Sequence, residues 1–142
     1  MRQSGQIERA RLEAPYLQTV YCVRLDDGSI LDLRIGRRHP RLDRRLARVH
    51  ARHWVFLTAW NPESTPLPAW RNAARQRVLR RCLKALPVLL PGIGIAEDGA
   101  WWEESLLAAS VSVGRARRFG RMFGQHAVVV GRVGGFARLC WC

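Results

Sequence analysis

The chain has 142 residues and a formal net charge of +13, with 24 basic residues against 11 acidic ones. A chain of this length is expected to form one domain whose core needs no disulfide or metal. No apolar run reaches the roughly 18 residues of a membrane span, and the first residues lack the apolar segment of a signal peptide. We therefore expect a cytoplasmic, single-domain protein that has no membrane partner.

The first part of the chain predicts a hairpin and then a helix. Residues 1–15 alternate charged and polar side chains, which is typical of a flexible segment ahead of a domain that spans 16–142. Residues 18–25 and 30–36 alternate apolar and polar side chains around a D-D-G-S turn, as the strands of a β-hairpin do. Residues 41–52 change to helical periodicity. The expected buried stripe of this helix is Leu42, Leu46 and Val49.

The middle of the chain combines a buried strand with a long helix. Residues 54–60 are apolar on both faces, which predicts a central strand covered on both sides. A polar loop, 61–68, leads into a helix over 69–86, which Pro87 ends. The apolar residues of this helix predict the following buried stripe: Ala74, Val78, Cys82 and Leu86.

The last third of the chain alternates strands and a helix. Residues 88–95 fit either a short strand or a loop, 105–113 predict a strand, and 114–124 predict a helix that ends at Gly124. Residues 127–133 and the C-terminal run predict a second hairpin. The expected fold is α+β, with a single mostly antiparallel sheet and about three helices packed on it. Four strand residues should be nearly fully buried: Val55, Leu57, Val128 and Val130.

The positive charge has two interpretations. A basic chain often binds a polyanion such as RNA or DNA. However, Lys84 is the only lysine, and such an arginine bias is also typical of a GC-rich genome. The second interpretation predicts arginines spread over solvated helix faces. We expect the following arginines to be largely exposed: Arg44, Arg45, Arg48, Arg80 and Arg81.

The cysteines and histidines do not predict a metal site. Cys22 and Cys82 lie within apolar patterns, which is typical of small buried residues. Cys140 and Cys142 supply only half of a tetrahedral site. His50 and His53 lack a third ligand. We therefore interpret both histidines as residues near a helix end. We expect no metal and no cofactor, and free thiols that suit a reducing compartment.

Polar residues interrupt the apolar pattern at four places, each of which is an expected element end. We expect these places to converge at one edge of the sheet, where α/β proteins often bind ligands. The interrupting residues are Asn61 and Ser64, Asn72, Glu103 to Ser105 after Trp101-Trp102, and Gln125 with His126. Each residue also has a simpler interpretation: Asn61 ahead of Pro62 makes a good turn, and a lone acid pairs readily with an arginine.

If these residues share a pocket, their chemistry suggests the following roles. Glu103, Glu104 or His126 would act as general acid or base. Amides do not titrate and would orient a ligand. A nucleotide-like ligand would suit amides and tryptophans through hydrogen bonds and stacking. The candidate ligand-binding residues are Asn61, Ser64, Asn72, Trp101 and Gln125.

The combination of these motifs resembles the bacterial domain-of-unknown-function 3293 family. The resemblance rests on "FLTAWNPES", on Asn72 within a helix, on "GIG" followed by a Trp and "EES", and on "FGQHAVVVG". It covers about residues 16–140 and implies a stand-alone cytoplasmic domain with no established activity. The family positions fall here on Asn61, Pro62, Ser64, Asn72, Trp101, Glu103, Ser105 and Gln125. Where the family commonly has Asn after that Gln, this chain has His126.

Three functions remain open from the sequence. The first is a polar amide and carboxylate pocket for a small or nucleotide-like ligand, with or without catalysis. The second is a basic nucleic-acid-binding module, although the chain lacks an RNP, KH or helix-turn-helix signature. The third is a protein-interaction partner. The sequence favours the pocket and specifies no reaction, because it contains no nucleophile elbow, phosphate loop or zinc motif.

Overall fold

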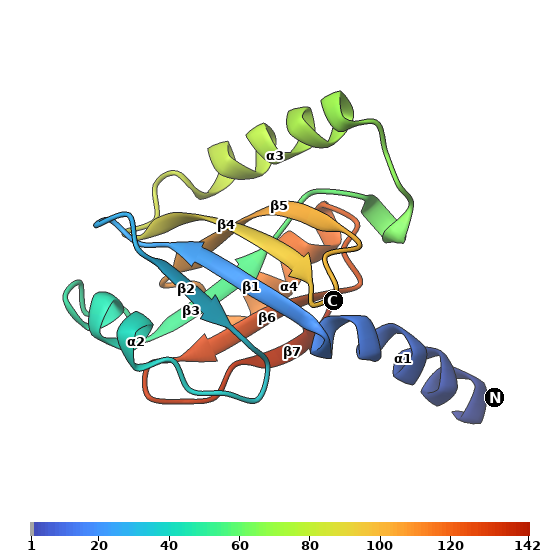
Figure 1. Ribbon diagram of the computed structural model, residues 1–142, viewed down its shortest axis with the longest axis horizontal. Helices are drawn as coiled ribbons and strands as arrows, with labels where there is room; N and C mark the ends of the chain where they lie inside the picture. Colours follow the sequence, from blue (N-terminus) through green and yellow to red (C-terminus); the bar gives the residue numbers. More distant parts are fainter. Residues whose placement is uncertain (1) are drawn as a thin grey trace.

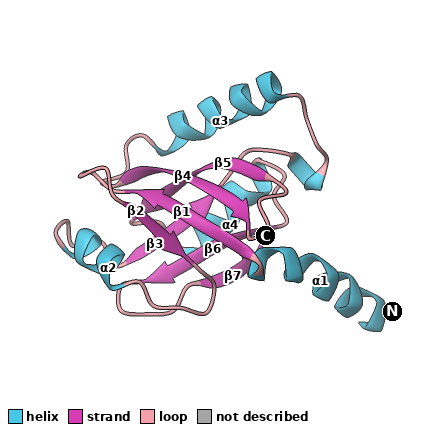
Figure 2. Cartoon of the chain, viewed as in Figure 1, coloured by secondary structure: helices cyan, strands magenta, loops and turns pink. Residues whose placement is uncertain are grey.

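A computed structural model describes residues 2–142 of the chain, with side chains from residue 5 onward (Figure 1). The elements in chain order are α1 (Arg2–Leu17), β1 (Thr19–Arg24), β2 (Ile30–Leu33), α2 (Pro40–Ala47), β3 (His53–Leu57), the 3-10 turn η1 (Pro62–Ser64), α3 (Ala69–Leu83), β4 (Leu89–Ala96), β5 (Trp102–Ala109), α4 (Val113–Met122), β6 (Ala127–Arg132) and β7 (Arg138–Trp141). All seven strands join one antiparallel sheet in the order β2-β1-β4-β5-β3-β6-β7 (Figure 2). The α+β prediction is confirmed.

Two element predictions need correction, and one open alternative is settled. The described residues contain four α-helices rather than about three, because α1 forms where only an irregular segment was expected. Residues 88–95 resolve as the strand β4, which lies inside the sheet between β1 and β5. Strand β5 begins at Trp102 and not at residue 105. Glu103 to Ser105 therefore lie within a strand, where alternate side chains point to opposite faces of the sheet.

The sheet curls until its two edges approach each other. Just after β2, the Gly36 N–H donates to the Ala137 carbonyl at 2.7 Å, and the Ala137 N–H donates to the Arg37 carbonyl at 3.0 Å. Ala137 directly precedes β7, which is the opposite edge of the sheet. The curl encloses an inner core that includes Tyr21 and Phe56. Helix α2 contributes Leu42 and Leu46 to this core, both fully buried.

Helices α3 and α4 cover the outer face of the sheet, and Figure 1 shows α3 lying above β4 and β5. The outer core contains Val55, Leu57, Val128 and Val130, all nearly fully buried as predicted. Strands β3 and β6 are interior strands, also as predicted.

The predicted stripe of α3 is wrong. Val78 is 45% exposed and Cys82 is exposed, so Cys82 is not a core residue. The buried residues of α3 are instead Asn72, Gln76, Leu79 and Leu83. This stripe keeps helical spacing but begins with two amides, whose role at the end of β3 is described below.

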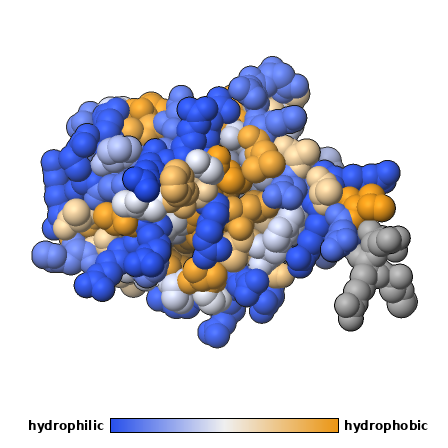
Figure 3. Space-filling model, turned by 90° about the horizontal axis from the view of Figure 1, so that it is seen from below, coloured by the Kyte–Doolittle hydropathy of each residue, from blue (hydrophilic) through white to orange (hydrophobic). Residues whose placement is uncertain are grey.

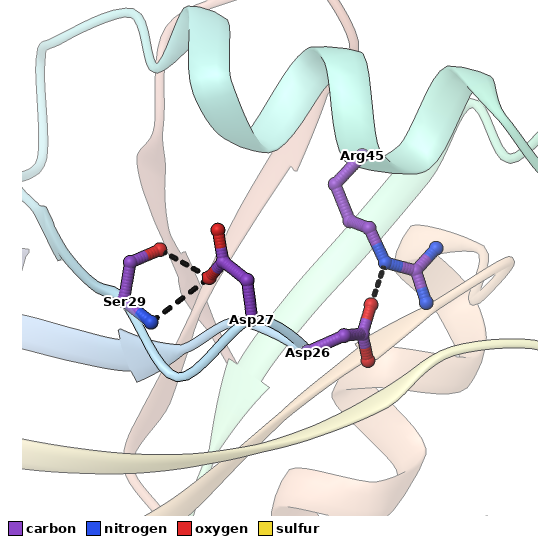
Figure 4. Close-up of polar contacts among 4 residues, drawn as sticks. All are labelled: Asp26, Asp27, Ser29 and Arg45. Atoms are coloured by element: carbon purple, nitrogen blue, oxygen red, sulfur yellow. Dashed lines mark hydrogen bonds and ion pairs between the residues drawn. The ribbon is translucent and has the colours of Figure 1, made fainter.

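The turn between β1 and β2 is stabilised by hydrogen bonds within the turn and by an ion pair to α2 (Figure 4). The Asp27 carboxylate accepts hydrogen bonds from the Ser29 N–H at 2.9 Å and from the Ser29 hydroxyl at 2.6 Å. Asp26 pairs with the Arg45 guanidinium. Arg45 is therefore only partly exposed, contrary to expectation, whereas Arg44 and Arg48 are exposed. Arg80 and Arg81 of α3 are exposed as well.

Charged residues are distributed over the molecule. Arginines occur on the exposed sides of α2, which packs on the inner core, and of α3 and α4, which cover the outer face of the sheet. On the face drawn in Figure 3, hydrophilic residues are spread across the whole surface, with hydrophobic ones between them. Among the helices of residues 2–142, none combines the length and the apolar composition that a membrane span requires.

Candidate functional site

A cavity of about 320 Å³ opens at the end of the inner core that lies away from α2. Its floor is apolar and includes Tyr21, Phe56 and Val129, which also belong to the inner core or pack beside it. Leu12 and Tyr16 of α1 form one wall. The remaining rim comes from the loop after β3, the start of β5 and the loop before β6. We call this cavity the inner pocket.

Most of the predicted site residues line the inner pocket. These are Asn61, Ser64, Trp101, Glu103, Ser105, Gln125 and His126. They come from three segments that are far apart in the sequence. Two candidates do not line the pocket: Asn72, which lies behind it and is almost fully buried, and Glu104.

Glu104 points to the other side of the sheet. It follows Glu103 in β5, and its carboxylate lies 4.0 Å from the Arg80 guanidinium of α3. Its side chain remains 45% exposed. Because alternate residues of a strand face opposite sides, β5 sends one carboxylate to the inner pocket and the next to the α3 side. The geometry does not support Glu104 as an acid or base of the pocket.

The loop after β3 has an unusual backbone. Asn61, Glu63 and Ser64 have φ values of 46°, 53° and 57°, in the left-handed region that non-glycine residues rarely adopt. The Glu63 N–H donates to the carbonyl of Gly124 at 2.7 Å, which ties this loop to the end of α4. Gly124 itself has φ of 67°, as its predicted role as a helix cap requires.

An amide network holds Asn61 in this conformation. The Asn61 N–H donates to Asn72 Oδ1 at 2.9 Å, and Asn72 Nδ2 donates to Asn61 Oδ1 at 2.8 Å. Asn61 Oδ1 also accepts the Leu67 N–H at 3.0 Å. Since the oxygen faces α3, the NH₂ group of Asn61 faces the pocket, where it donates to Glu103 Oε1 at 3.1 Å.

Three further side chains complete the junction between β3, α3 and α4. Gln125 Nε2 donates to the Trp60 carbonyl at 2.9 Å. Arg75 donates to the carbonyls of Ala59 and Phe123 at 2.8 and 2.6 Å. The Ala59 N–H donates to Gln76 Oε1 at 2.9 Å. The backbone groups after the end of β3 are therefore satisfied by side chains, as buried polar groups require.

Glu103 has fewer partners than these amides. Burial raises the pKa of its carboxyl above the ordinary value, and the hydrogen bond from Asn61 only partly offsets this effect. Within the described side chains, Glu103 has no ion-pair partner. Nearby, burial raises the pKa of Tyr16 to about 12, and the negative charge of Glu103 adds to that shift. Both tyrosines of the pocket are therefore neutral phenols at neutral pH, since burial raises the pKa of Tyr21 as well.

Tryptophans frame the outer rim. Trp101 is 41% exposed and lines the pocket, whereas Trp102 packs against Trp60 with ring centroids 5.0 Å apart. No group of three or more His, Cys, Asp or Glu side chains in the described part of the chain is placed to hold a metal ion.

Several pocket residues carried no signal in the sequence. Gly94 of β4 lies on the pocket floor, and a Cβ there would meet only ordinary contacts, at 3.9 Å to Ser105 and Thr19. Tyr16 directly follows residues 1–15, the segment that was expected to be flexible. Phe56 was interpreted as a core residue and is one, but its ring also lines the cavity. Only the curl of the sheet brings these residues together.

Comparison with known proteins places the chain in a family. A family model described as "Protein of unknown function (DUF3293)" matches residues 57–128, which is just over half of the chain. No curated protein and no solved structure matches this chain. The matched span runs from the last residue of β3 into β6 and includes Asn61, Asn72, Glu103 and Gln125. The chain therefore belongs to the domain-of-unknown-function 3293 family.

Proposed function

We propose that this protein binds a small organic molecule in the inner pocket. The observation that carries the proposal is a cavity of about 320 Å³ whose floor is apolar and whose rim holds fixed polar groups. Small-molecule sites commonly combine an apolar lining with a few well-placed hydrogen-bonding groups. A flat part of the ligand would pack on Tyr21 and Phe56, and its polar part would face Glu103, Gln125 and His126.

The strained loop supports the same proposal. Three non-glycine residues between 61 and 64 adopt positive φ, a conformation that costs about 1–3 kcal/mol per residue and persists only where the surrounding structure enforces it. The amide network supplies that enforcement, and its result is an Asn61 amide that faces the pocket. Strain of this kind is common at ligand sites.

Proton transfer to or from the ligand is consistent with the lining. Glu103 and His126 both face the inner pocket, and both are side chains that commonly act as general acid or base. The raised pKa of Glu103 favours a carboxyl that exchanges its proton closer to neutral pH than an ordinary glutamate does. Ligand binding is the primary proposal, and catalysis would require it.

The experiment fills the pocket without changing its rim. Gly94→Val places two methyl groups at the floor, where a Cβ is sterically tolerated. Gly114→Val adds the same atoms on α4, where nothing lies within 4 Å. Amide NMR spectra would be recorded with indole and with 2-phenylethanol at millimolar concentrations. We expect shifts around residues 94, 103 and 125 in the wild type and in Gly114→Val, and none in Gly94→Val.

Shifts that are absent from the wild type, or that persist unchanged in Gly94→Val, would contradict the proposal. Folding of each variant is checked by its urea unfolding midpoint, because a misfolded Gly94→Val would also lose the shifts.

A second candidate function is binding of single-stranded nucleic acid on the outer side of α3. This helix contains no acidic residue. Arg71, Arg77 and Arg81 are exposed on it, and Trp70 is 71% exposed at its start. Arginines would contact phosphates and the tryptophan would stack on a base. The test is the affinity for a labelled poly(U) oligonucleotide, which should fall steeply with salt and weaken in Arg77→Glu.

A further inference from the structure

We infer that the ligand of the inner pocket carries a cationic nitrogen, such as a primary ammonium group, that pairs with the carboxylate of Glu103. This inference rests on the proposed function and adds the chemical class of the ligand. It separates an amine from a phosphate-bearing nucleotide, which the sequence alone had left open.

The first step is the charge of the lining. The chain carries 24 basic residues and a net charge of +13, yet none of the residues that line the inner pocket is lysine or arginine. Glu103 is the only acidic residue among them. An anionic ligand would therefore meet a carboxylate at close range with no arginine to bind its phosphate or carboxylate, whereas a cationic ligand would find an opposite charge.

The second step is the incomplete set of partners around Glu103. A carboxylate offers about four lone-pair sites. In the described side chains, one donor reaches the carboxylate of Glu103, namely Asn61 Nδ2 at 3.1 Å. Two other acids of the chain are better paired: Asp27 accepts two hydrogen bonds from Ser29, and Asp26 forms an ion pair with Arg45.

The third step is that the network fixes this state. Asn61 Oδ1 is held by Leu67 and Asn72, so Asn61 cannot turn its oxygen toward the pocket without losing both hydrogen bonds. Its NH₂ group therefore always faces Glu103. A carboxyl that already has one fixed donor, in apolar surroundings that disfavour an unpaired charge, is well prepared to accept a cation.

The fourth step is the fit of an aromatic amine. An ammonium group at Glu103 would leave the rest of the molecule against Phe56 and Tyr21, and Trp101 stands at the rim. Aromatic faces attract a cation within about 6 Å of the ring centroid, which adds to the preference for the amine. The cavity of about 320 Å³ has room for one aromatic ring with a short side chain.

The test compares three probes that share a phenyl ring and differ in the charge of their end group. They are 2-phenylethylamine, 2-phenylethanol and 3-phenylpropionate, titrated by NMR at pH 7.5 into the full chain. We expect the amine to bind more tightly than the alcohol, and about tenfold more tightly than the propionate, a difference of about 1.4 kcal/mol. In Glu103→Gln the advantage of the amine over the alcohol should disappear. In Glu104→Gln, whose carboxylate faces α3, it should persist.

The outcomes separate this inference from the proposed function. If amine and alcohol bind alike in the wild type and Gly94→Val abolishes both, the pocket stands and the amine preference is overturned. The preference is also overturned if the propionate binds most tightly or if both glutamine variants behave the same. If no probe binds the wild type at millimolar concentration, the pocket proposal fails together with the amine.

Discussion

The two ends of the curled sheet are built differently. At one end, α2 inserts Leu42 and Leu46, which are completely buried in the inner core. At the other end, the same core continues into a cavity of about 320 Å³. Helix α1 covers this second end only in part, since Leu12 and Tyr16 are its only residues with partial burial from position 5 onward. One end is closed by buried side chains of α2, and the other end contains the inner pocket.

The polar groups follow the same division. Asn72 of α3, which lies behind the cavity, has hydrogen-bond partners for both its oxygen and its nitrogen atom. Glu103, which faces the cavity, has a single donor. We expect from this difference that the network behind Asn61 stabilises the fold, and the proposed function assigns the groups in front of it to a ligand. The predictions below test this division.

The largest effect is expected at the closed end. Leu46→Ala removes a fully buried side chain and should lower the free energy of unfolding by about 2–5 kcal/mol. Leu12→Ala, at the wall of the pocket, removes the same atoms from a half-buried position and should cost under about 1 kcal/mol. Urea unfolding of both variants measures the difference. Equal losses would show that α1 closes its end as firmly as α2.

A smaller loss is expected behind the pocket. Asn72→Ala leaves the Asn61 N–H, Asn61 Oδ1 and the Leu67 carbonyl without the donor or acceptor that Asn72 supplies. Unpaired buried groups cost about 1–3 kcal/mol, so we expect a loss of about 2–3 kcal/mol in urea unfolding. Arg71→Ala, one residue earlier and exposed, is the control and should stay within about 0.5 kcal/mol. If Asn72→Ala loses no more unfolding free energy than the Arg71→Ala control, the network does not stabilise the fold.

The backbone of Asn61 allows a matched pair of variants. Asn61→Ala and Asn61→Gly both lose the amide, but only glycine accepts φ of 46° without a steric penalty. We expect alanine to be less stable than glycine by about 1 kcal/mol, in addition to the loss that both share. Thermal unfolding of the two proteins measures this difference. If they melt together, the left-handed conformation stores no strain.

The smallest effect, and one of opposite sign, is expected in front of the network. Glu103→Gln keeps an oxygen that can accept from Asn61 and removes a carboxyl whose pKa is raised by burial. A carboxyl with a raised folded-state pKa favours folding when protonated, and this benefit is lost as pH rises through that pKa. The glutamine variant should therefore be as stable as the wild type below about pH 4. At pH 7 it should be more stable by on the order of 0.5–1 kcal/mol. A variant less stable than the wild type at pH 7 would place Glu103 in the structural network.

The sequence predicted which segments come together better than it predicted which face of each helix is buried. Polar interruptions at Asn61, Asn72, Glu103 and Gln125 led to the expectation of one edge, and the structure brings these segments into hydrogen-bonded contact. The stripe of α3 was predicted from apolar spacing alone. Buried amides break that rule, because Asn72 and Gln76 face inward to bind the backbone after β3.

Two other features lay beyond sequence patterns. Strand β5 begins at Trp102, three residues before the predicted strand 105–113. The opposite directions of Glu103 and Glu104 therefore became evident only from the strand register in the structure. Gly94 on the pocket floor and Tyr16 in its wall line the cavity together with Phe56 only because the sheet curls and α1 covers part of its end. Such meetings are set by tertiary packing and leave no local periodicity.

The most direct test of the division between the two sides of Asn61 is the pKa of Glu103, measured from its carboxyl ¹³C shift in the free protein and with 2-phenylethylamine. A carboxyl that is buried with one donor and no cation should titrate above the usual value of about 4.3 in the free protein. Its pKa should fall when the amine binds, because an adjacent positive charge favours the carboxylate. A pKa at or below 4.3 in the free protein, unchanged by the amine, would show that Glu103 is already paired within the fold and is not available to a ligand.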